Sequence, residues 1–152
     1  MTRTTLIVGY GNPLRGDDGV GQAVARAFSS EAIEGVEALA CHQLAPELAE
    51  RFAAAERVVL VDAAAGREAG EVSVVALQAA AARPPRLGHH FEPAELLRMA
   101  QAFYGRAPEA YLVTVGAGSF ELGEQLSPSV AAALPEVLAA VRKLALAPPR
   151  RT

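Results

Sequence analysis

The sequence has little cysteine, little clustered basic charge and no long apolar run, and each shortage excludes a class of protein. Cys41 is the single cysteine in 152 residues, which excludes an internal disulfide and fits a reducing cytoplasm. The formal net charge is -3 and the basic cluster worth naming lies at 148–151, so nucleic acid is not expected as a partner. No segment approaches the roughly 20 apolar residues of a membrane helix, and the start of the chain lacks the apolar stretch of a signal peptide. We therefore expect a cytoplasmic protein that does not associate with membranes.

Apolar residues are plentiful. They make up 51% of the chain against 20% for charged residues, which suffices for the core of one compact domain. Strand-like and helix-like segments alternate through the first half, which favours an α/β layered fold. We expect a single α/β domain over 1–147, a flexible tail over 148–152, and a monomer. The expected strands are 5–8, 36–41, 57–62, 71–77 and 110–115, and the expected helices are 18–29, 46–54, 93–103 and 128–146.

A glycine-rich turn follows the first expected strand and ends in two adjacent carboxylates. It runs from Gly9 to Gly21 and reads GYGNPLRGDDGVG. A dinucleotide fingerprint would need glycine in place of Leu14. A phosphate-binding P-loop would need lysine and a hydroxyl residue where Asp17 and Asp18 stand, and two anions repel a phosphate. The turn therefore predicts a site for a cation or for proton transfer.

Another interpretation of the two acids is structural. Asp17 is a suitable N-cap for a helix that begins near Asp18, and acids in a first helical turn complement the helix dipole. Because adjacent carboxylates repel each other, we expect different roles, one as a ligand and the other as a cap or hydrogen-bond acceptor. Asp17 is also a candidate general base.

Asp62 ends the continuous apolar strand 57–62, a pattern typical of a strand buried on both faces of a parallel sheet. Because ligands bind outside the carboxyl ends of such strands, Asp18 and Asp62 are predicted to share one rim. One imidazole of the His89–His90 pair can reach that rim from a loop. Two oxygens and one nitrogen leave coordination positions open, as a reactive metal site requires. The alternatives are that Asp62 only begins a turn and that the histidines are ordinary surface residues.

Cys41 and His42 invite interpretation as a nucleophile and its base. Successive side chains on a strand point to opposite faces, so the two are not expected to act together. We interpret Cys41 as core filler.

The chain resembles, over almost its whole length, the endopeptidases that mature nickel-iron hydrogenases. The glycine-rich turn resembles that family's pattern of G-x-G-N, a short loop and D-[DE]-G. Three other segments resemble its second acidic position, its histidine-plus-helix element and its usual close before the last helix; they are 60–63 (LVDA), 89–97 (HHFEPAELL) and 120–128 (FELGEQLSP).

The resemblance implies a three-layer sandwich, in which helices cover both faces of a twisted, mostly parallel five-stranded sheet. It also implies an endopeptidase that removes the C-terminal extension of a hydrogenase large-subunit precursor once nickel has been inserted. Carried over by position, the metal-binding and catalytic residues are Asp18, Asp62 and His89. The spacing to 94–95 favours His89 over His90. The metal would be nickel, supplied by the precursor, or an equivalent divalent ion.

One segment departs from the family's pattern. Several members carry Asp-Gly-Gly after the second strand, whereas this chain has Cys41, His42 and Gln43. The family's third acid is therefore absent, which implies a differently shaped substrate cleft. Two other functions stay open at this point, a nickel-binding carrier or chaperone without proteolysis and a metallohydrolase of small molecules.

Overall fold

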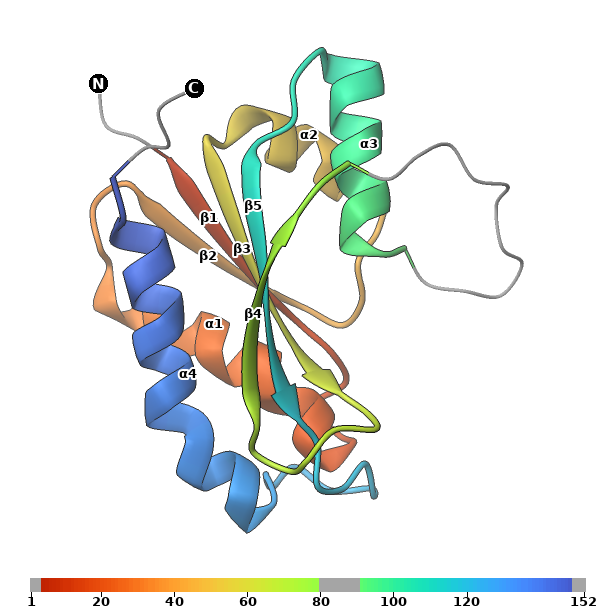
Figure 1. Cartoon of the computed structure of the whole chain (residues 1–152), viewed down its shortest axis with the longest axis vertical. Coiled ribbons are helices and arrows are strands. Elements are labelled where there is room, and N and C mark those ends of the chain that lie inside the picture. The colour runs from red at the N-terminus through yellow and green to blue at the C-terminus, as the bar shows by residue number, and fades with distance from the viewer. Residues whose placement is uncertain (1–3, 80–90, 149–152) are drawn as a thin grey trace.

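The computed structural model describes residues 4–79 and 91–148, which alternate between strands and helices along the chain (Figure 1). The element η1 is a single 3-10 turn. In chain order the elements are β1 (Thr5–Tyr10), η1 (Gly16–Gly19), α1 (Val20–Glu31), β2 (Val36–Cys41), α2 (Leu48–Ala54), β3 (Arg57–Ala64), β4 (Val72–Leu77), α3 (Pro93–Tyr104), β5 (Glu109–Gly116) and α4 (Pro128–Leu146).

The strands form one five-stranded sheet in the order β2-β1-β3-β5-β4. β4 is an edge strand antiparallel to β5, and the other neighbouring pairs are parallel. The expected mostly parallel five-stranded sheet is therefore confirmed. Tyr10 is paired with Cys41 of β2, and Gly9 with Val61 of β3, so β1, β2 and β3 all end at the same rim.

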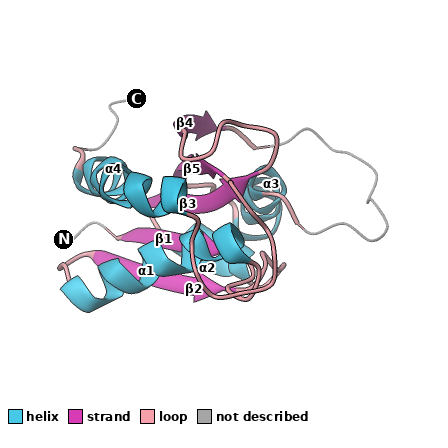
Figure 2. Cartoon of the chain, turned by 90° about the horizontal axis from the view of Figure 1, so that it is seen from below, coloured by secondary structure: helices cyan, strands magenta, loops and turns pink. Residues whose placement is uncertain are grey.

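Helices cover both faces of this sheet, as expected (Figure 2). On one face, Leu6 and Val8 of β1 pack with residues of α2 and α3. On the other face, Ile7 of β1 packs with residues of α1 and α4. β3 is buried from Arg57 to Val61 because it is covered on both sides, which explains its continuous apolar run.

The first helix begins later than the sequence predicts. The expected helix over 18–29 is replaced by the tight turn η1 followed by α1, whose residues Val20, Val24 and Phe28 are buried at a spacing of one helical turn. α1 lies so close to the sheet that a Cβ on Gly21 would be 2.4 Å from the carbonyl oxygen of Val61. The last glycine of the turn is therefore required by packing.

α3 begins and ends at residues whose local chemistry favours those positions. Glu92 and Glu95 form a capping box around the first turn, and Pro93 occupies the first helical position. Gly105 ends the helix in the left-handed conformation, with φ of 78°. α4 has Pro128 at its start and continues through Pro135.

One buried arginine ties the end of the chain to the sheet. Arg57, at the start of β3, donates a hydrogen bond to the carboxylate of Glu109 on β5 at 2.9 Å. It also donates to the carbonyl oxygens of Leu144, Ala147 and Pro148 at 2.7, 2.7 and 2.9 Å. Arg57 thus fixes the last turn of α4 against the sheet.

Within residues 4–79 and 91–148, no helix combines the length and apolar character needed to cross a bilayer.

Candidate active site

The turn after β1 brings Asp18 to the carboxyl rim of the sheet. The backbone N–H of Asn12 donates a 2.6 Å hydrogen bond to Oδ2 of Asp18. Gly11 has a φ of 140°, and a Cβ there would be 2.0 Å from the Asp18 carbonyl oxygen. Only glycine fits at this crossing, so the turn holds its second acid in a defined place.

Asp17 has a different role, because its carboxylate is fully buried and accepts four hydrogen bonds. Oδ2 accepts from the backbone N–H groups of Gly118 and Ser119 at 2.6 and 2.9 Å and from the Ser127 hydroxyl at 2.8 Å. Oδ1 accepts from the Ser127 N–H at 2.7 Å. Burial alone would raise the pKa of Asp17, but these hydrogen bonds outweigh it and hold the pKa below its usual value.

Two interpretations of Asp17 are therefore wrong. It does not cap α1, since the residue before that helix is Gly19 and no side chain caps it. It is not a general base either, because it is buried and both oxygens are occupied by donors. Its carboxylate instead connects η1 to Gly118, Ser119 and Ser127, the last of which precedes α4. This fits the expectation that one of the two acids is a hydrogen-bond acceptor.

Asp62 lies in β3, the strand next to β1. Its environment disfavours a negative charge. Burial and the nearby charge of Asp18 raise its pKa to about 7, against an ordinary value of 3.8. Hydrogen bonds from the Ala63 N–H, at 2.8 Å, and from the Tyr10 hydroxyl act in the opposite direction. The strand continues to Ala64, so Asp62 does not begin a turn. The two acids interact electrostatically, as their predicted shared rim requires.

Asp18 and Asp62 line one cavity of about 760 Å³ at the carboxyl ends of β1, β2 and β3. Its apolar wall includes Leu44, Leu77 and Phe91, the last of which precedes α3. Its polar lining includes Arg15 and Glu92 besides the two acids. An apolar wall with several convergent polar groups is typical of a ligand site. The third predicted ligand, His89, and its alternative His90 lie outside the described residues, so their roles stay predictions.

His42 also lines this cavity, and sequence reasoning missed it. The argument from strand alternation does not apply, because β2 ends at Cys41 and His42 belongs to the turn beyond it. The signal in the sequence that could have identified His42 is that residues 41–43 differ from the Asp-Gly-Gly of several family members at this point. Cys41 is partly buried and packs against the core, and burial raises the pKa of its thiol, in agreement with its interpretation as filler.

The two acids suit a divalent cation as part of a larger donor set. Burial is the main cause of the raised pKa of Asp62, and repulsion by Asp18 adds to it. A cation between the two acids would relieve that repulsion, and carboxylate oxygens are common ligands of such ions. Over residues 4–79 and 91–148, no group of three His, Cys, Asp or Glu side chains is placed to hold a metal by itself. A cation at these two acids would need further ligands.

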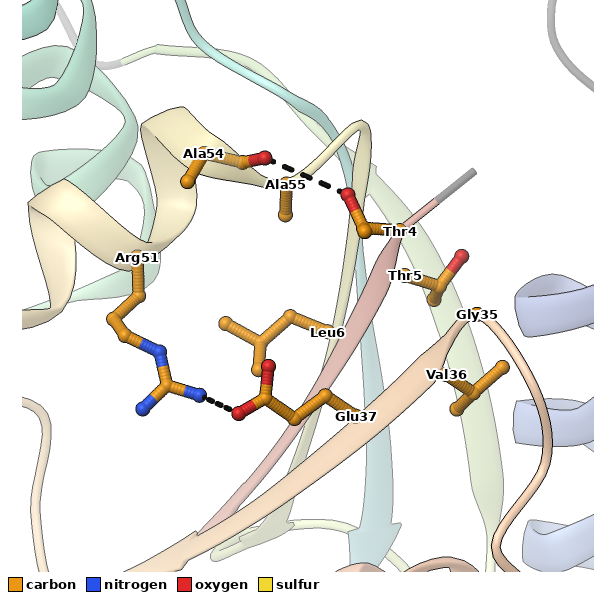
Figure 3. Close-up of a pocket in the computed structure, with 9 residues that line it drawn as sticks. All are labelled: Thr4, Thr5, Leu6, Gly35, Val36, Glu37, Arg51, Ala54 and Ala55. Carbon is orange, nitrogen blue, oxygen red and sulfur yellow. Dashed lines mark hydrogen bonds and ion pairs between the residues drawn. The ribbon is translucent and has the colours of Figure 1, made fainter. Parts of the chain in front are cut away.

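A smaller hollow of about 330 Å³ lies at the opposite ends of the strands, beside Thr4 and Thr5 (Figure 3). Its charged residues, Glu37 and Arg51, form an ion pair with each other. Among the described residues that line it, no second acid accompanies Glu37. This hollow therefore lacks a pair of carboxylates like Asp18 and Asp62.

No protein-family model matches the sequence, and no curated protein does, but several solved structures match the fold. The maturation endopeptidase HybD from Escherichia coli has a TM-score of 0.71 at 22% identity, covering 91% of this chain and 89% of its own. The NiFe hydrogenase maturation protease HycI from Thermococcus kodakarensis has a TM-score of 0.71 at 25% identity, covering 94% of this chain and 92% of its own. A hydrogenase 2 maturation peptidase from a Thaumarchaeota archaeon has a TM-score of 0.70 at 23% identity, covering 93% and 97%.

The fold is that of the NiFe hydrogenase maturation endopeptidases. The resemblance drawn from the sequence motifs is thus confirmed by structures that cover nine-tenths of the chain or more. The maturation-endopeptidase fold places Asp18 and Asp62 at its carboxyl rim in this chain.

Proposed function

We propose that this chain is an endopeptidase that removes the C-terminal extension of a NiFe hydrogenase large-subunit precursor after nickel insertion. The observation that carries the proposal is the convergence of Asp18 and Asp62 in one cavity, within a fold shared with maturation endopeptidases. The precursor is the proposed partner. A monomer in the reducing cytoplasm is the proposed form of the enzyme.

Asp18 and Asp62 each offer a carboxylate oxygen to a divalent ion, and His89 adds an imidazole by resemblance. The nickel belongs to the substrate, because it arrives in the precursor. When bound, it polarises the scissile carbonyl and lowers the pKa of an attacking water. The raised pKa of Asp62 has a consequence for this step, because binding a cation favours the ionised carboxylate and releases its proton.

Two other functions are less well supported. A carrier or chaperone for nickel would need the same acids, and a small-molecule metallohydrolase would need a similar cavity. Several solved structures that share this fold are named as endopeptidases or proteases, which favours peptide-bond hydrolysis over both.

The test is incubation of the purified chain with nickel-loaded and nickel-free precursor, followed by mass spectrometry of the precursor. We expect the nickel-loaded form alone to lose its C-terminal tail. Asp18→Asn and Asp62→Asn should each reduce processing roughly 100-fold or more, while circular dichroism stays unchanged. Glu50→Gln, at an exposed site on α2, is the matched control and should process normally.

The outcomes separate the hypotheses. Equal cleavage of both precursor forms would contradict licensing by nickel and leave the protease assignment in place. Retained activity in both aspartate variants would show that the site is misassigned. No cleavage of either precursor, together with nickel binding, would favour the carrier.

A further inference from the structure

The turn that carries His42 is fixed to the turn that carries Asp18. The backbone N–H of Gly11 donates to the carbonyl oxygen of Cys41 at 3.2 Å. The buried amide of Gln22 donates to the carbonyl oxygens of Gly11 and Cys41 at 2.9 and 3.0 Å. A single side chain on α1 thus holds both turns together. The residue before His42 is therefore fixed relative to the turn that carries Asp18.

His42 itself is exposed and faces the cavity that contains both acids. The sequence has three histidines, and His42 is the one within the described residues. Imidazole suits proton transfer because it takes up and releases protons near neutral pH. Its side chain has access to water in the cavity without unfolding of any element.

Hydrolysis needs a group that accepts a proton from the attacking water, and the other ionisable groups in or near the described part of the cavity are less suited to this role. Glu92 lines the cavity, but its carboxylate accepts a hydrogen bond in the capping box of α3. Asp17, beside the turn of Asp18, is buried and occupied by four donors. Asp18 and Asp62 are engaged as ligands under the proposed function. Burial raises the pKa of the Tyr10 hydroxyl far above its usual value, so it keeps its proton.

We propose that His42 is the acid–base catalyst of the proposed peptidase reaction, an inference that rests on the proposed function. The imidazole takes one proton from water as the water oxygen forms a bond to the scissile carbonyl carbon, and the carbonyl electron pair moves onto its oxygen. When the carbonyl re-forms, the C–N bond breaks. The imidazolium then gives its proton to the leaving nitrogen, so peptide and water become an acid and an amine.

The experiment compares His42→Ala, His42→Gln and Glu47→Gln with the unaltered chain on nickel-loaded precursor. Glu47 is an exposed residue between His42 and α2, outside the lining of the cavity, and is the control. We expect kcat to fall roughly 100- to 1,000-fold in both His42 variants, with KM changed little. Glu47→Gln should retain the kcat of the unaltered chain. Because His42 is exposed, the variants should keep the circular dichroism of the unaltered chain.

Two further measurements separate proton transfer from a structural or metal-binding role. Added imidazole should partly restore the kcat of His42→Ala, and it should not restore His42→Gln, whose side chain fills the space. Ni²⁺ affinity of the free protein, measured by calorimetry, should be the same in His42→Ala and the unaltered chain.

Normal kcat in His42→Ala would overturn the inference while the proposed function stands. Loss of Ni²⁺ affinity without rescue by imidazole would make His42 a ligand and would also overturn it. If the unaltered chain cleaves no precursor, the proposed function fails and the inference falls with it.

Discussion

The carboxyl group of Asp62 lies where its charged form is disfavoured. Burial and the charge of Asp18 raise its pKa to about 7, so at neutral pH it is only partly ionised in the folded protein. In an unfolded chain the same group ionises near its ordinary value of 3.8. The protonated form therefore stabilises the fold, and this contribution is lost as pH rises.

A pH series on Asp62→Asn tests this effect. The pKa is higher in the folded state, so the stabilising contribution is complete below pH 3.8 and is lost as pH rises through about 7. Asparagine stays neutral, and its oxygen can still accept from the Ala63 N–H. We expect the free energy of unfolding of the variant to exceed that of the unaltered chain by about 2–4 kcal/mol at pH 8. At pH 4 the two values should be nearly equal.

The measurement is urea unfolding in EDTA, so that bound metal does not stabilise the unaltered chain. Glu50→Gln, at an exposed position of α2, should show no such gain in the free energy of unfolding at pH 8. A variant that is no more stable than the unaltered chain at pH 8 would show that Asp62 is not held in a disfavoured charge state.

How well the sequence predicts the site depends on how far apart in the chain the interacting residues lie. Asp18 and Asp62 were predicted together because strand ends obey a general rule of parallel sheets. The hydrogen-bond donors to Asp17 lie more than 100 positions further along the chain, and no local sequence pattern predicts them. His42 was set aside because an alternation rule for strands was applied one residue beyond the strand.

Two turns distant in sequence are joined at one side of the site. The N–H of Gly16 donates to the carbonyl oxygen of Gly123, and the N–H of Gly123 donates to that of Leu14, both at 2.8 Å. The Asp17 carboxylate adds its bonds to the first residue before α4. The segment that positions Asp18 is therefore supported by residues from the last quarter of the chain.

Asp17→Asn should weaken this connection. An amide nitrogen replaces one carboxylate oxygen, so at least one buried backbone N–H loses its acceptor, which destabilises by about 2–3 kcal/mol at pH 7. The folded pKa of Asp17 is lowered, so its contribution is complete above the ordinary value of 3.8 and is lost as pH falls through the folded value. The difference between the variant and the unaltered chain should therefore narrow below pH 3.8.

Urea unfolding of both proteins across pH 3 to 8 gives the comparison. Glu121→Gln, an exposed change in the same loop, should alter stability by less than about 0.5 kcal/mol. A difference that is constant over the whole range would mean that the charge of Asp17 does not contribute.

At the scale of the whole molecule, Arg57 joins β3, β5 and the end of α4. Arg57→Met removes a buried guanidinium and leaves several carbonyl oxygens with fewer donors. Glu109 keeps a 2.6 Å hydrogen bond from the Tyr111 hydroxyl, which limits the damage. We expect the free energy of unfolding to fall by about 3 kcal/mol.

Arg51→Met provides the contrast, because Arg51 pairs with Glu37 on the surface, where the two side chains are 41% and 70% exposed. This change should lower the free energy of unfolding by less than about 1 kcal/mol. Thermal or urea unfolding measures both variants. If the two variants lose equal amounts of the free energy of unfolding, the buried Arg57 is no more important for stability than the surface Arg51.

The layered architecture was predictable from alternating strands and helices, since each element buries one face against its neighbours. The boundaries were less accurate, because β1 and β3 extend to Tyr10 and Ala64 through pairing with their neighbours. Such extension depends on the partner strand and leaves no mark in the segment's own sequence.

The bonds between Asp17 and Ser127 also set an order of events during protein synthesis. Ribosomes make a chain from its amino terminus, so both acids of the cavity emerge long before Ser127, the residue that precedes α4. Until it appears, two of the four donors to Asp17 are missing. A nascent chain therefore carries both acids of the cavity before the bonds that fix the turn of Asp18 can form, and the site is completed only when the last helix docks.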